Sequence, residues 1–403
     1  MKKTFTPIIT SLMDLDFYKL TMQQVFFHRF PKASAEYAFK LRNDGISLVF
    51  LKDDINKQLD HLCSLSFEKD ELQYLTSLKV NGMSVFKPSY IQMLKTFKLE
   101  RDNIHVFTQG DELKITAQGV LFSSMLFEIY VLAIVNELYF RTFNKKADFE
   151  LAQSNFETKM SRLTDLNMIS EGVNPVQVTD FGTRRRFSKE WQFNIVSQMQ
   201  KNYPKIFAGT SNVLLSMELN TMPVGTMAHE FLQAMQALTT QGLIHSQKDA
   251  LEIWLEEYRG SLAVALTDVI GMKSFLKDYD YLLSKSYDGT RHDSGDPSWW
   301  AELQIKHYED MDIDPKTKSI VFSDGLKVDV IEDLYRKFSG RIQVFFGWGT
   351  NLTNDFGFET LNIVMKIIRC NNQPVVKISD SDGKTMCDEP WYIDYVKKIF
   401  NIK

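Results

Sequence analysis

Residues 287–297 read YDGTRHDSGDP and hold three aspartates, an arginine and a histidine within a short stretch. Two glycines and a proline break it up, as in a turn or loop. Carboxylates suit sugar hydroxyls or Mg²⁺, and a guanidinium suits phosphate or carboxylate groups. Asp293 and Arg291 are therefore candidate ligand-binding residues. The alternative is a salt-bridged loop in which Asp296 caps a helix that begins at Pro297.

A second candidate site is the glycine-containing segment GWGT at 347–350, which follows the strand-like run RIQVFF. Gly347 and Gly349 would let the backbone approach a ligand closely, and successive N–H groups could bind an anion. Together with Thr350, they are interpreted as a phosphate-binding loop. A simple turn is the alternative.

Two further segments combine a strand end with groups suited to phosphate chemistry. The segment DFGTRRRFS, residues 180–188, contains Arg184, Arg185 and Arg186, which could bind several phosphate charges. The alternative is a basic helix start that pairs with acidic residues and is capped by Ser188. In PVGTMAHEF, residues 223–231, His229 could act as a base or accept a phosphoryl group, although a lone histidine is more often structural.

More carboxylates follow neighbouring strand-like runs, Asp268 in LTDVIG and Asp324 in IVFSDG. Several carboxylates at one edge repel each other unless cations lie among them. We therefore predict that Mg²⁺ and basic side chains lie among these carboxylates. A plain turn before Gly325 is the alternative for Asp324.

The amino-terminal segment MDLDFYKLTMQQVFF, residues 13–27, predicts a helix capped by Asp14 or Asp16. Tyr18 lies one turn inside this helix. It is either a half-buried aromatic residue or a stacking face for a flat ligand.

From about residue 175 onward, short apolar runs alternate with stretches of helical length, which predicts βα units and a parallel sheet. Because these run ends are numerous, we expect an irregular (β/α) TIM-like barrel over residues 151–354, with an open doubly wound sheet as the alternative. The carboxyl-terminal ends of these apolar runs lie at 178–182, 206–212, 222–229, 264–271, 289–297, 320–325 and 344–351.

The flanking parts of the chain have a different pattern. Residues 1–150 mix helical segments with short strands, which indicates an α+β domain. Residues 355–403 contain an expected hairpin, LNIVMKIIRC followed by NNQPVV, that we predict returns to the amino-terminal domain.

Composition excludes several classes of function. The net charge of −4 in 403 residues provides no general attraction to nucleic acid or anionic membranes. The most apolar window, 119–135, includes Glu128 and two serines, so we expect a buried helix there and no membrane span. Three cysteines without a CxxC pair fit a reducing compartment, so we expect a cytoplasmic protein.

Taken together, the phosphate loop, the carboxylates and the clustered arginines suit a sugar with phosphate at one end and pyrophosphate at the other. Phosphoribosyl pyrophosphate has this chemistry, and Tyr18 would stack on its aromatic reaction partner.

The motifs also resemble a known family. MDLDFYKLTM, DFGTRRRFS, GTSN (209–212), PVGTMAHEF, GTRHDSGDP, FSDG, GWGTNLTND and KISDSDGKTMCD follow one another along nearly the whole chain. They are similar to those of nicotinate phosphoribosyltransferases of the bacterial ATP-coupled type, within the type II phosphoribosyltransferases.

The resemblance implies conversion of nicotinate, phosphoribosyl pyrophosphate, ATP and water to nicotinate mononucleotide, pyrophosphate, ADP and phosphate. This ligase-type reaction is the first step of NAD salvage from nicotinic acid. The resemblance also implies a homodimer with shared active sites.

The resemblance assigns a role to each matching position. His229 would be transiently phosphorylated by ATP, and Tyr18 would stack on nicotinate from the partner subunit. Thr226 and Arg291 would contact nicotinate, and Asp293 and Asp324 would serve ribose or Mg²⁺. The remaining matches are the phosphate-loop residues and the basic pair, namely Gly347, Gly349, Thr350, Arg184 and Arg185.

Three rival functions remain open at this point. The same fold could act on nicotinamide or quinolinate, the chain could be a non-catalytic nucleotide sensor, or it could be a sugar-phosphate isomerase. An isomerase needs a base that abstracts a proton, and His229 is the one strong candidate.

Overall fold

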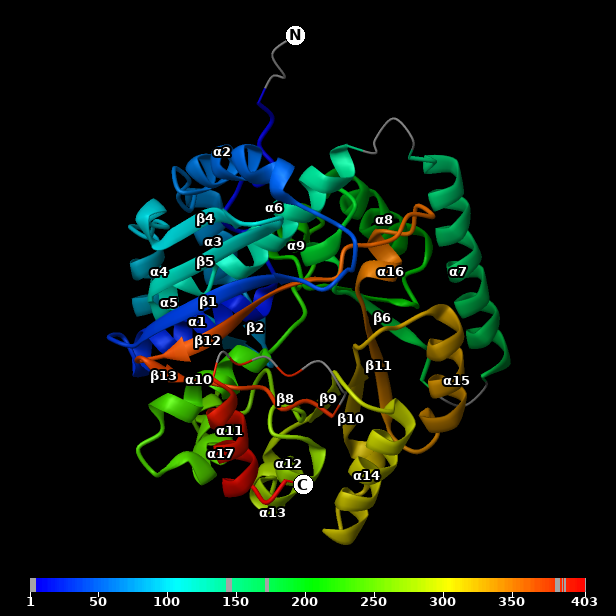
Figure 1. Cartoon of the computed structure of the whole chain (residues 1–403). Coiled ribbons are helices and arrows are strands. Elements are labelled where there is room, and N and C mark those ends of the chain that lie inside the picture. Colours follow the sequence, from blue (N-terminus) through cyan, green and yellow to red (C-terminus); the bar gives the residue numbers. More distant parts are fainter. Residues whose placement is uncertain are drawn as a thin grey trace.

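The computed structural model describes residues 5–142, 147–170, 174–380, 385, 387 and 389–402. Within these residues the chain forms two large sheets that lie side by side, and a third sheet of two short strands (Figure 1). The last part of the KISDSDGKTMCD segment, residues 381–384, 386 and 388, lies outside the described residues.

The first sheet is antiparallel and joins the two ends of the chain. Its strand order is β13 (Gln373–Pro374), β12 (Ile363–Cys370), β1 (Ser34–Leu41), β5 (Glu112–Val120) and β4 (Ile104–Gln109). The hairpin predicted after residue 355 is β12 and β13, and β12 pairs with β1 from Ala35 opposite Cys370 to Leu41 opposite Ile363. Burial alternates along β1, so one face of this sheet packs on the core.

The second sheet is parallel, as the alternation of strands and helices predicts. Its order is β7 (Phe207–Thr210), β6 (Gln177–Asp180), β11 (Gln343–Trp348), β10 (Ser319–Phe322), β9 (Gly289–His292) and β8 (Val264–Leu266). All of its strand pairs are parallel, so the carboxyl ends of the strands share one edge. Arg184, Asp293, Asp324 and Thr350 follow these ends, and Arg291 lies within the end of β9.

One of the predicted strand ends was wrong. Residues 222–229 do not follow a strand, and the segment has a single parallel bridge, from Pro223 to Thr210 at the end of β7. Val224 N donates to Thr210 O over 2.9 Å, and Thr226 Oγ1 donates to Val264 O in β8 over 2.8 Å. This irregular segment therefore lies between the two edge strands, and the described sheet has six strands instead of the eight of a regular barrel.

Helices cover both sheets. In the amino-terminal half they are α1 (Phe17–Arg29), α2 (Lys52–Leu62), α3 (Lys69–Ser77), α4 (Pro88–Leu94), α5 (Leu121–Ser124) and α6 (Phe127–Arg141), with a small hairpin of β2 (Lys79–Val80) and β3 (Met83–Ser84). In the remainder they are α7 (Phe149–Ile169), α8 (Lys189–Asn202), α9 (Val213–Glu218), α10 (His229–Leu238), α11 (Ser246–Tyr258), α12 (Met272–Asp278), α13 (Tyr281–Ser286), α14 (Pro297–Asp310), α15 (Val328–Phe338), α16 (Thr350–Thr353) and α17 (Pro390–Ile399). Figure 1 shows α7, α14 and α15 on the outside of the parallel sheet.

The local signals for helix starts have mixed outcomes. Asp296 caps α14 by accepting from Trp299 N, and Ser188 caps α8 by accepting from Trp191 N, so the caps named in the two alternative interpretations are present. For α1 the predicted capping hydrogen bond was wrong. Asp16 precedes the helix, but its side chain makes no bond to the first turn and instead accepts from Ser211 Oγ over 2.6 Å.

The most apolar helical stretch is internal. Residues 121–141 are long and apolar enough to cross a membrane by length and composition alone, and 89% of the most apolar window is buried inside the protein. This agrees with the buried helix that its serines and Glu128 predict.

A buried ion pair connects the amino-terminal segment to the parallel sheet. The guanidinium of Arg186, just after β6, donates two parallel hydrogen bonds to Asp14, at 2.7 and 2.8 Å. Both side chains are essentially inaccessible to solvent. Burial acts to raise the pKa of Asp14, but Arg186 outweighs burial and lowers it.

We predict that Arg186→Met destabilises the protein by about 3–5 kcal/mol, because it leaves the Asp14 carboxylate buried without its cation. Chemical denaturation followed by circular dichroism measures this change. The matched control is Arg341→Met, since Arg341 makes a similar two-pronged pair with Glu302 at the surface. Its loss should cost at most about 1 kcal/mol, and equal effects in the two variants would contradict the prediction.

Candidate active site

The main candidate site is a cavity between the carboxyl edge of the parallel sheet and the face of the antiparallel sheet. The segments that line it come from α1, α6, the turn after β6, α10, β9 and β12. Its described lining residues include four carboxylates and four basic groups, namely Asp16, Glu128, Glu230 and Asp293 together with Arg184, Arg185, Arg291 and Lys366. Such an arrangement suits a ligand with several negative charges and several hydroxyl groups.

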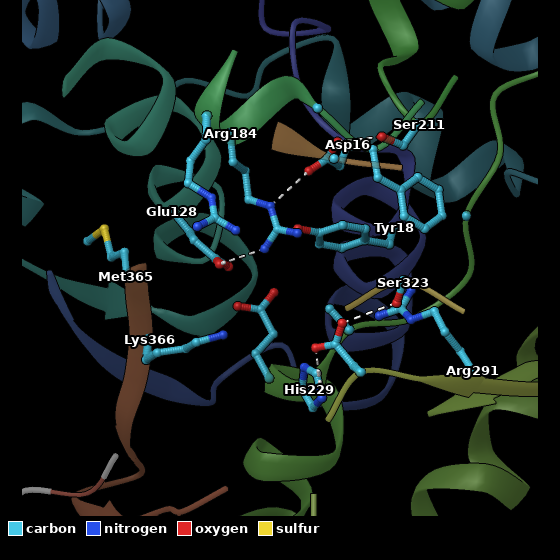
Figure 2. Close-up of a pocket in the computed structure, with 18 of the residues that line it drawn as sticks. Asp16, Tyr18, Glu128, Arg184, Ser211, His229, Arg291, Ser323, Met365 and Lys366 are labelled. Carbon is cyan, nitrogen blue, oxygen red and sulfur yellow. Dashed lines mark hydrogen bonds and ion pairs between the residues drawn. The ribbon is translucent and has the colours of Figure 1, made fainter. Parts of the chain in front are cut away.

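Arg184 and Tyr18 form one wall of the cavity (Figure 2). The Arg184 guanidinium lies between Asp16, at 3.6 Å, and Glu128, at 3.9 Å, and its centre is 6.0 Å from the centre of the Tyr18 ring. These contacts are longer than hydrogen bonds, so the guanidinium retains donors for a ligand. Tyr18 reaches the cavity from its own chain, so its position gives no support to the expected contribution from a partner subunit.

The three consecutive arginines separate into two groups. Arg184 and Arg185 line the cavity, whereas Arg186 points the other way to Asp14. Burial lowers the pKa of Arg185 to about 10, and the nearby charge of Arg184 acts in the same direction. The sequence left open which arginines reach a ligand, and the structure favours the first two.

Arg291 and Asp293 line the opposite wall, at the end of β9. Among the described residues, the buried Arg291 Nε has no hydrogen-bond partner, so part of the donor capacity of this guanidinium is unused. Ser323 Oγ lies 2.9 Å from His292 O and 3.1 Å from Asp293 Oδ1, so these two acceptors share its single proton.

The predicted phosphate loop contributes Gly349 and Thr350 to the lining. Thr350 begins α16, so its backbone N–H lies at a helix start next to the cavity. Gly347 does not line the cavity, and a side chain there would meet the Phe181 ring, because an added Cβ would lie 2.2 Å from Phe181 Cε2. Phe181, which sequence reasoning did not single out, itself lines the cavity.

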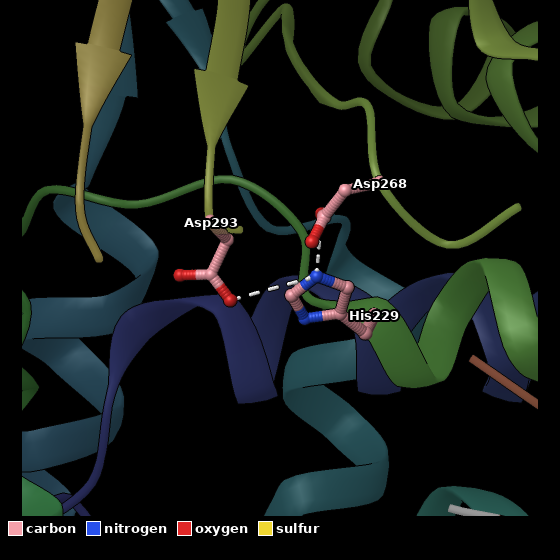
Figure 3. Close-up of side chains that lie close together, drawn as sticks. All are labelled: His229, Asp268 and Asp293. Carbon is pink, nitrogen blue, oxygen red and sulfur yellow. Dashed lines mark hydrogen bonds and ion pairs between the residues drawn. The ribbon is translucent and has the colours of Figure 1, made fainter. Parts of the chain in front are cut away.

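His229 begins α10 and is held between two carboxylates (Figure 3). Its Nε2 is 2.8 Å from Asp268 Oδ1 and 3.5 Å from Asp293 Oδ2. Burial lowers the pKa of His229, and the positive charge of Lys377 acts in the same direction. The imidazole is therefore neutral at neutral pH, with Nε2–H donating to Asp268 and a lone pair on Nδ1.

The candidate metal ligands around His229 suit Mg²⁺ only in part. His229, Asp268 and Asp293 offer ligand atoms within 4.8 Å of one another. However, Mg²⁺ prefers oxygen ligands, and Lys377 Nζ already lies 2.6 Å from Asp268 Oδ2. Asp293 is the carboxylate that both lines the cavity and suits the ion, whereas Asp324, the other predicted ligand, does not line it.

Thr226 also falls outside the lining residues. Its hydroxyl donates to Val264 O, and its carbonyl accepts from Thr21 Oγ1 over 2.7 Å. These bonds attach the irregular segment 222–229 to β8 and α1. The structure therefore does not bring the Thr226 hydroxyl to a ligand.

Sequence reasoning missed several charged groups of the cavity. Lys19 is fully buried and binds Glu128 at 2.7 Å and Glu230 at 2.6 Å. Burial raises the pKa of Glu230 to about 7, although Lys19 opposes this. Lys366, on β12, points into the cavity in Figure 2, and burial lowers its pKa to about 8. Lys19 and Glu230 fall within quoted motifs and Glu128 within the most apolar window, but their residue types and spacing gave no sign that they meet at one site.

Comparison with known proteins agrees with this geometry. The profile of the Nicotinate phosphoribosyltransferase (NAPRTase) family matches residues 176–403, and that of the NAPRTase N-terminal domain matches residues 13–136. The chain belongs to the nicotinate phosphoribosyltransferase family.

Members of this family resemble the chain over nearly its full length. A nicotinate phosphoribosyltransferase of Chromobacterium violaceum is 48% identical and covers 98% of both chains, and that of Acinetobacter baylyi is 47% identical over 99% of this chain and 98% of its own. The crystal structure of a nicotinate phosphoribosyltransferase from Vibrio cholerae has a TM-score of 0.92 at 35% identity, and covers 98% of this chain and 94% of that chain.

We predict that Gly347→Ala destabilises the protein by about 1–3 kcal/mol, because the new methyl group forces the Phe181 ring to move. Thermal or chemical denaturation measures the loss. Gly340→Ala is the control, since an added Cβ at Gly340 meets nothing within 4 Å. If both variants have wild-type stability, Phe181 does not pack against Gly347.

Proposed function

We propose that this chain is an ATP-coupled nicotinate phosphoribosyltransferase that catalyses the first step of NAD salvage from nicotinic acid. The ring nitrogen of nicotinate attacks the anomeric carbon of phosphoribosyl pyrophosphate, the bond to pyrophosphate breaks, and nicotinate mononucleotide forms. ATP and water are converted to ADP and phosphate in the same cycle. Family membership supports the transfer, and the arrangement at His229 supports the coupling to ATP.

The walls of the cavity suggest where each part of the substrates binds. Tyr18 offers a face for the pyridine ring, and Arg291, with its unpartnered Nε, suits the nicotinate carboxylate. Thr350 and Gly349 suit the 5′-phosphate at the start of α16. Arg184 and Arg185 suit the pyrophosphate.

The transfer requires little proton chemistry. The pyridine nitrogen already carries a lone pair, so no base has to activate it. The leaving pyrophosphate accumulates negative charge as the bond breaks, and the basic lining groups stabilise that charge. Carboxylates such as Asp293 stabilise the positive charge that develops on the ribose ring. The protein therefore acts mainly by positioning and electrostatics.

The observation that carries ATP coupling is that, among the described residues, His229 is hydrogen-bonded through Nε2 alone. Asp268 accepts from Nε2, so the lone pair of Nδ1 is the nucleophile. Nδ1 attacks the γ-phosphorus of ATP, the bond to the bridging oxygen breaks, and ADP leaves. Water later cleaves the nitrogen–phosphorus bond, which releases phosphate and restores the imidazole.

Mg²⁺ is the expected cofactor, and Asp293 is the lining carboxylate that would hold it. When bound, the ion would neutralise part of the phosphate charge. The assignment of Asp324 as a second ligand, the closed barrel, the homodimer and the cytoplasmic location stay predictions.

We predict that His229→Ala abolishes phosphorylation by ATP and the stimulation of transfer by ATP, while slow transfer without ATP remains measurable. The test is mass spectrometry of the 223–231 peptide after incubation with Mg-ATP, under alkaline conditions that preserve phosphohistidine. Nicotinate and phosphoribosyl pyrophosphate should discharge the phosphate. His245→Ala, at an exposed histidine, is the control and should behave as the wild type. An unmodified peptide from active wild-type protein would contradict the coupling.

We predict that Tyr18→Ala raises the KM for nicotinate about 3- to 10-fold, because a stacking contact contributes roughly 0.5–1.5 kcal/mol. Tyr18→Phe keeps the ring and should leave this KM within about twofold of the wild type. Steady-state kinetics at saturating phosphoribosyl pyrophosphate separate the two variants. An unchanged KM in Tyr18→Ala would exclude stacking by this residue.

A further inference from the structure

A short segment near the carboxyl terminus crosses the edge of the parallel sheet next to His229. This segment, residues 375–380, is called the C-terminal strap below. It follows β13 and passes the ends of β8 and β9, where the orange-to-red chain runs in Figure 1. Ile378 N donates to Val269 O over 2.7 Å, and Asp380 N donates to Ser294 Oγ over 3.1 Å. The strap is thus bound to the loops that follow both strands.

The C-terminal strap is also bound to the helix that carries His229. Gln236 on α10 donates from Nε2 to Val376 O over 2.7 Å and accepts from Val376 N at Oε1 over 2.9 Å. Both bonds are buried, and Gln236 lies two turns after His229 on the same helix. The positions of His229 and the strap are therefore coupled through one short helix.

Lys377 is the residue of the strap that reaches the His229 group. Its ammonium lies 2.6 Å from Asp268 Oδ2, while His229 Nε2 lies 2.8 Å from Asp268 Oδ1. One carboxylate thus bridges the lysine and the histidine. Lys377 also lies 3.8 Å from Asp293 Oδ2, and only about 7% of Lys377 is exposed.

The second oxygen of Asp268 is held from two directions. Ser294 Oγ donates to Asp268 Oδ2, and so does Lys377. With Oδ2 occupied, Oδ1 is the oxygen left for His229 Nε2, and the direction of this carboxylate sets the rotation of the imidazole ring. A buried carboxylate that lost its cation would reorient or bind the imidazole differently.

We propose that Lys377 is a positioning residue for the phosphoryl transfer from ATP to His229. It binds Asp268 from the C-terminal strap so that Asp268 holds His229 Nε2 and leaves Nδ1 directed at the phosphoryl donor. Its charge also offsets that of two carboxylates at the place where a phosphate of charge near −2 is added. This inference rests on the proposed ATP coupling and goes beyond it by assigning a role to Lys377, the first residue of the KISDSDGKTMCD segment, to which the resemblance assigned none.

The experiment compares wild-type protein with Lys377→Met, Lys377→Gln and Lys377→Arg. Lys318→Met is the matched control, because Lys318 is equally buried but donates to the carbonyls of Lys285 and Tyr287, away from the cavity. Quenched-flow mixing with Mg-ATP, followed by mass spectrometry of the 223–231 peptide, measures the rate of phosphorylation. Thermal denaturation shows which variants are folded, and transfer without ATP is measured for each protein.

We expect Lys377→Met and Lys377→Gln to slow phosphorylation about 10- to 100-fold, which is typical when a group that orients a functional residue is removed. Lys377→Arg keeps the charge and should recover the rate to within about fivefold of the wild type. Lys318→Met should phosphorylate at the wild-type rate. If Lys377→Met does not fold, Lys377→Gln decides the comparison.

Three results would overturn the inference. A folded Lys377→Met or Lys377→Gln that is phosphorylated at the wild-type rate would remove the need for the lysine. Equal slowing in Lys377→Arg or Lys318→Met would indicate a merely structural effect. If the wild-type protein transfers phosphoribosyl groups but is never phosphorylated, the proposed ATP coupling itself fails, and the role of Lys377 falls with it.

Discussion

The buried pair of Asp14 and Arg186 is the interaction on which the candidate site most depends. It joins the segment before α1 to the turn after β6, which are distant in sequence. Because Asp14 is fixed, Asp16 and Tyr18 enter the cavity a few residues later, and Arg184 meets them from the other side. The amino-terminal helix and the carboxyl edge of the parallel sheet thus form one site.

Charge balance is the second constraint on this site. Its described lining contains equal numbers of carboxylates and basic groups, and Lys19 and Lys377 bind carboxylates from behind. A cavity with a large net charge of one sign would either repel phosphates or hold them too tightly to release them. Paired charges also keep each guanidinium and carboxylate in a defined direction, which reduces reorganisation during the reaction.

The carboxyl-terminal part of the chain packs against the amino-terminal domain and also contributes residues to the site. β12 pairs with β1, and the same segment brings Lys366 into the cavity and Lys377 to Asp268. The antiparallel sheet is therefore more than a cover for the parallel sheet, because it supplies cations to the site. The segment 222–229 has a comparable task, since its irregular backbone places His229 at the start of α10.

The sequence by itself determined the alternation of strands and helices, the caps Asp296 and Ser188, and the residues Arg291, Asp293, His229 and Thr350, because these signals are local. Only the tertiary structure shows that Arg184 and Arg185 line the cavity and that Arg186 does not. It also shows that Thr226 and Gly347 lie outside the lining. It also added Glu128, Glu230, Lys366 and Lys377. Whether a buried charged residue serves a site depends on partners more than a hundred residues away, such as Asp268 for Lys377. No local pattern encodes such pairings.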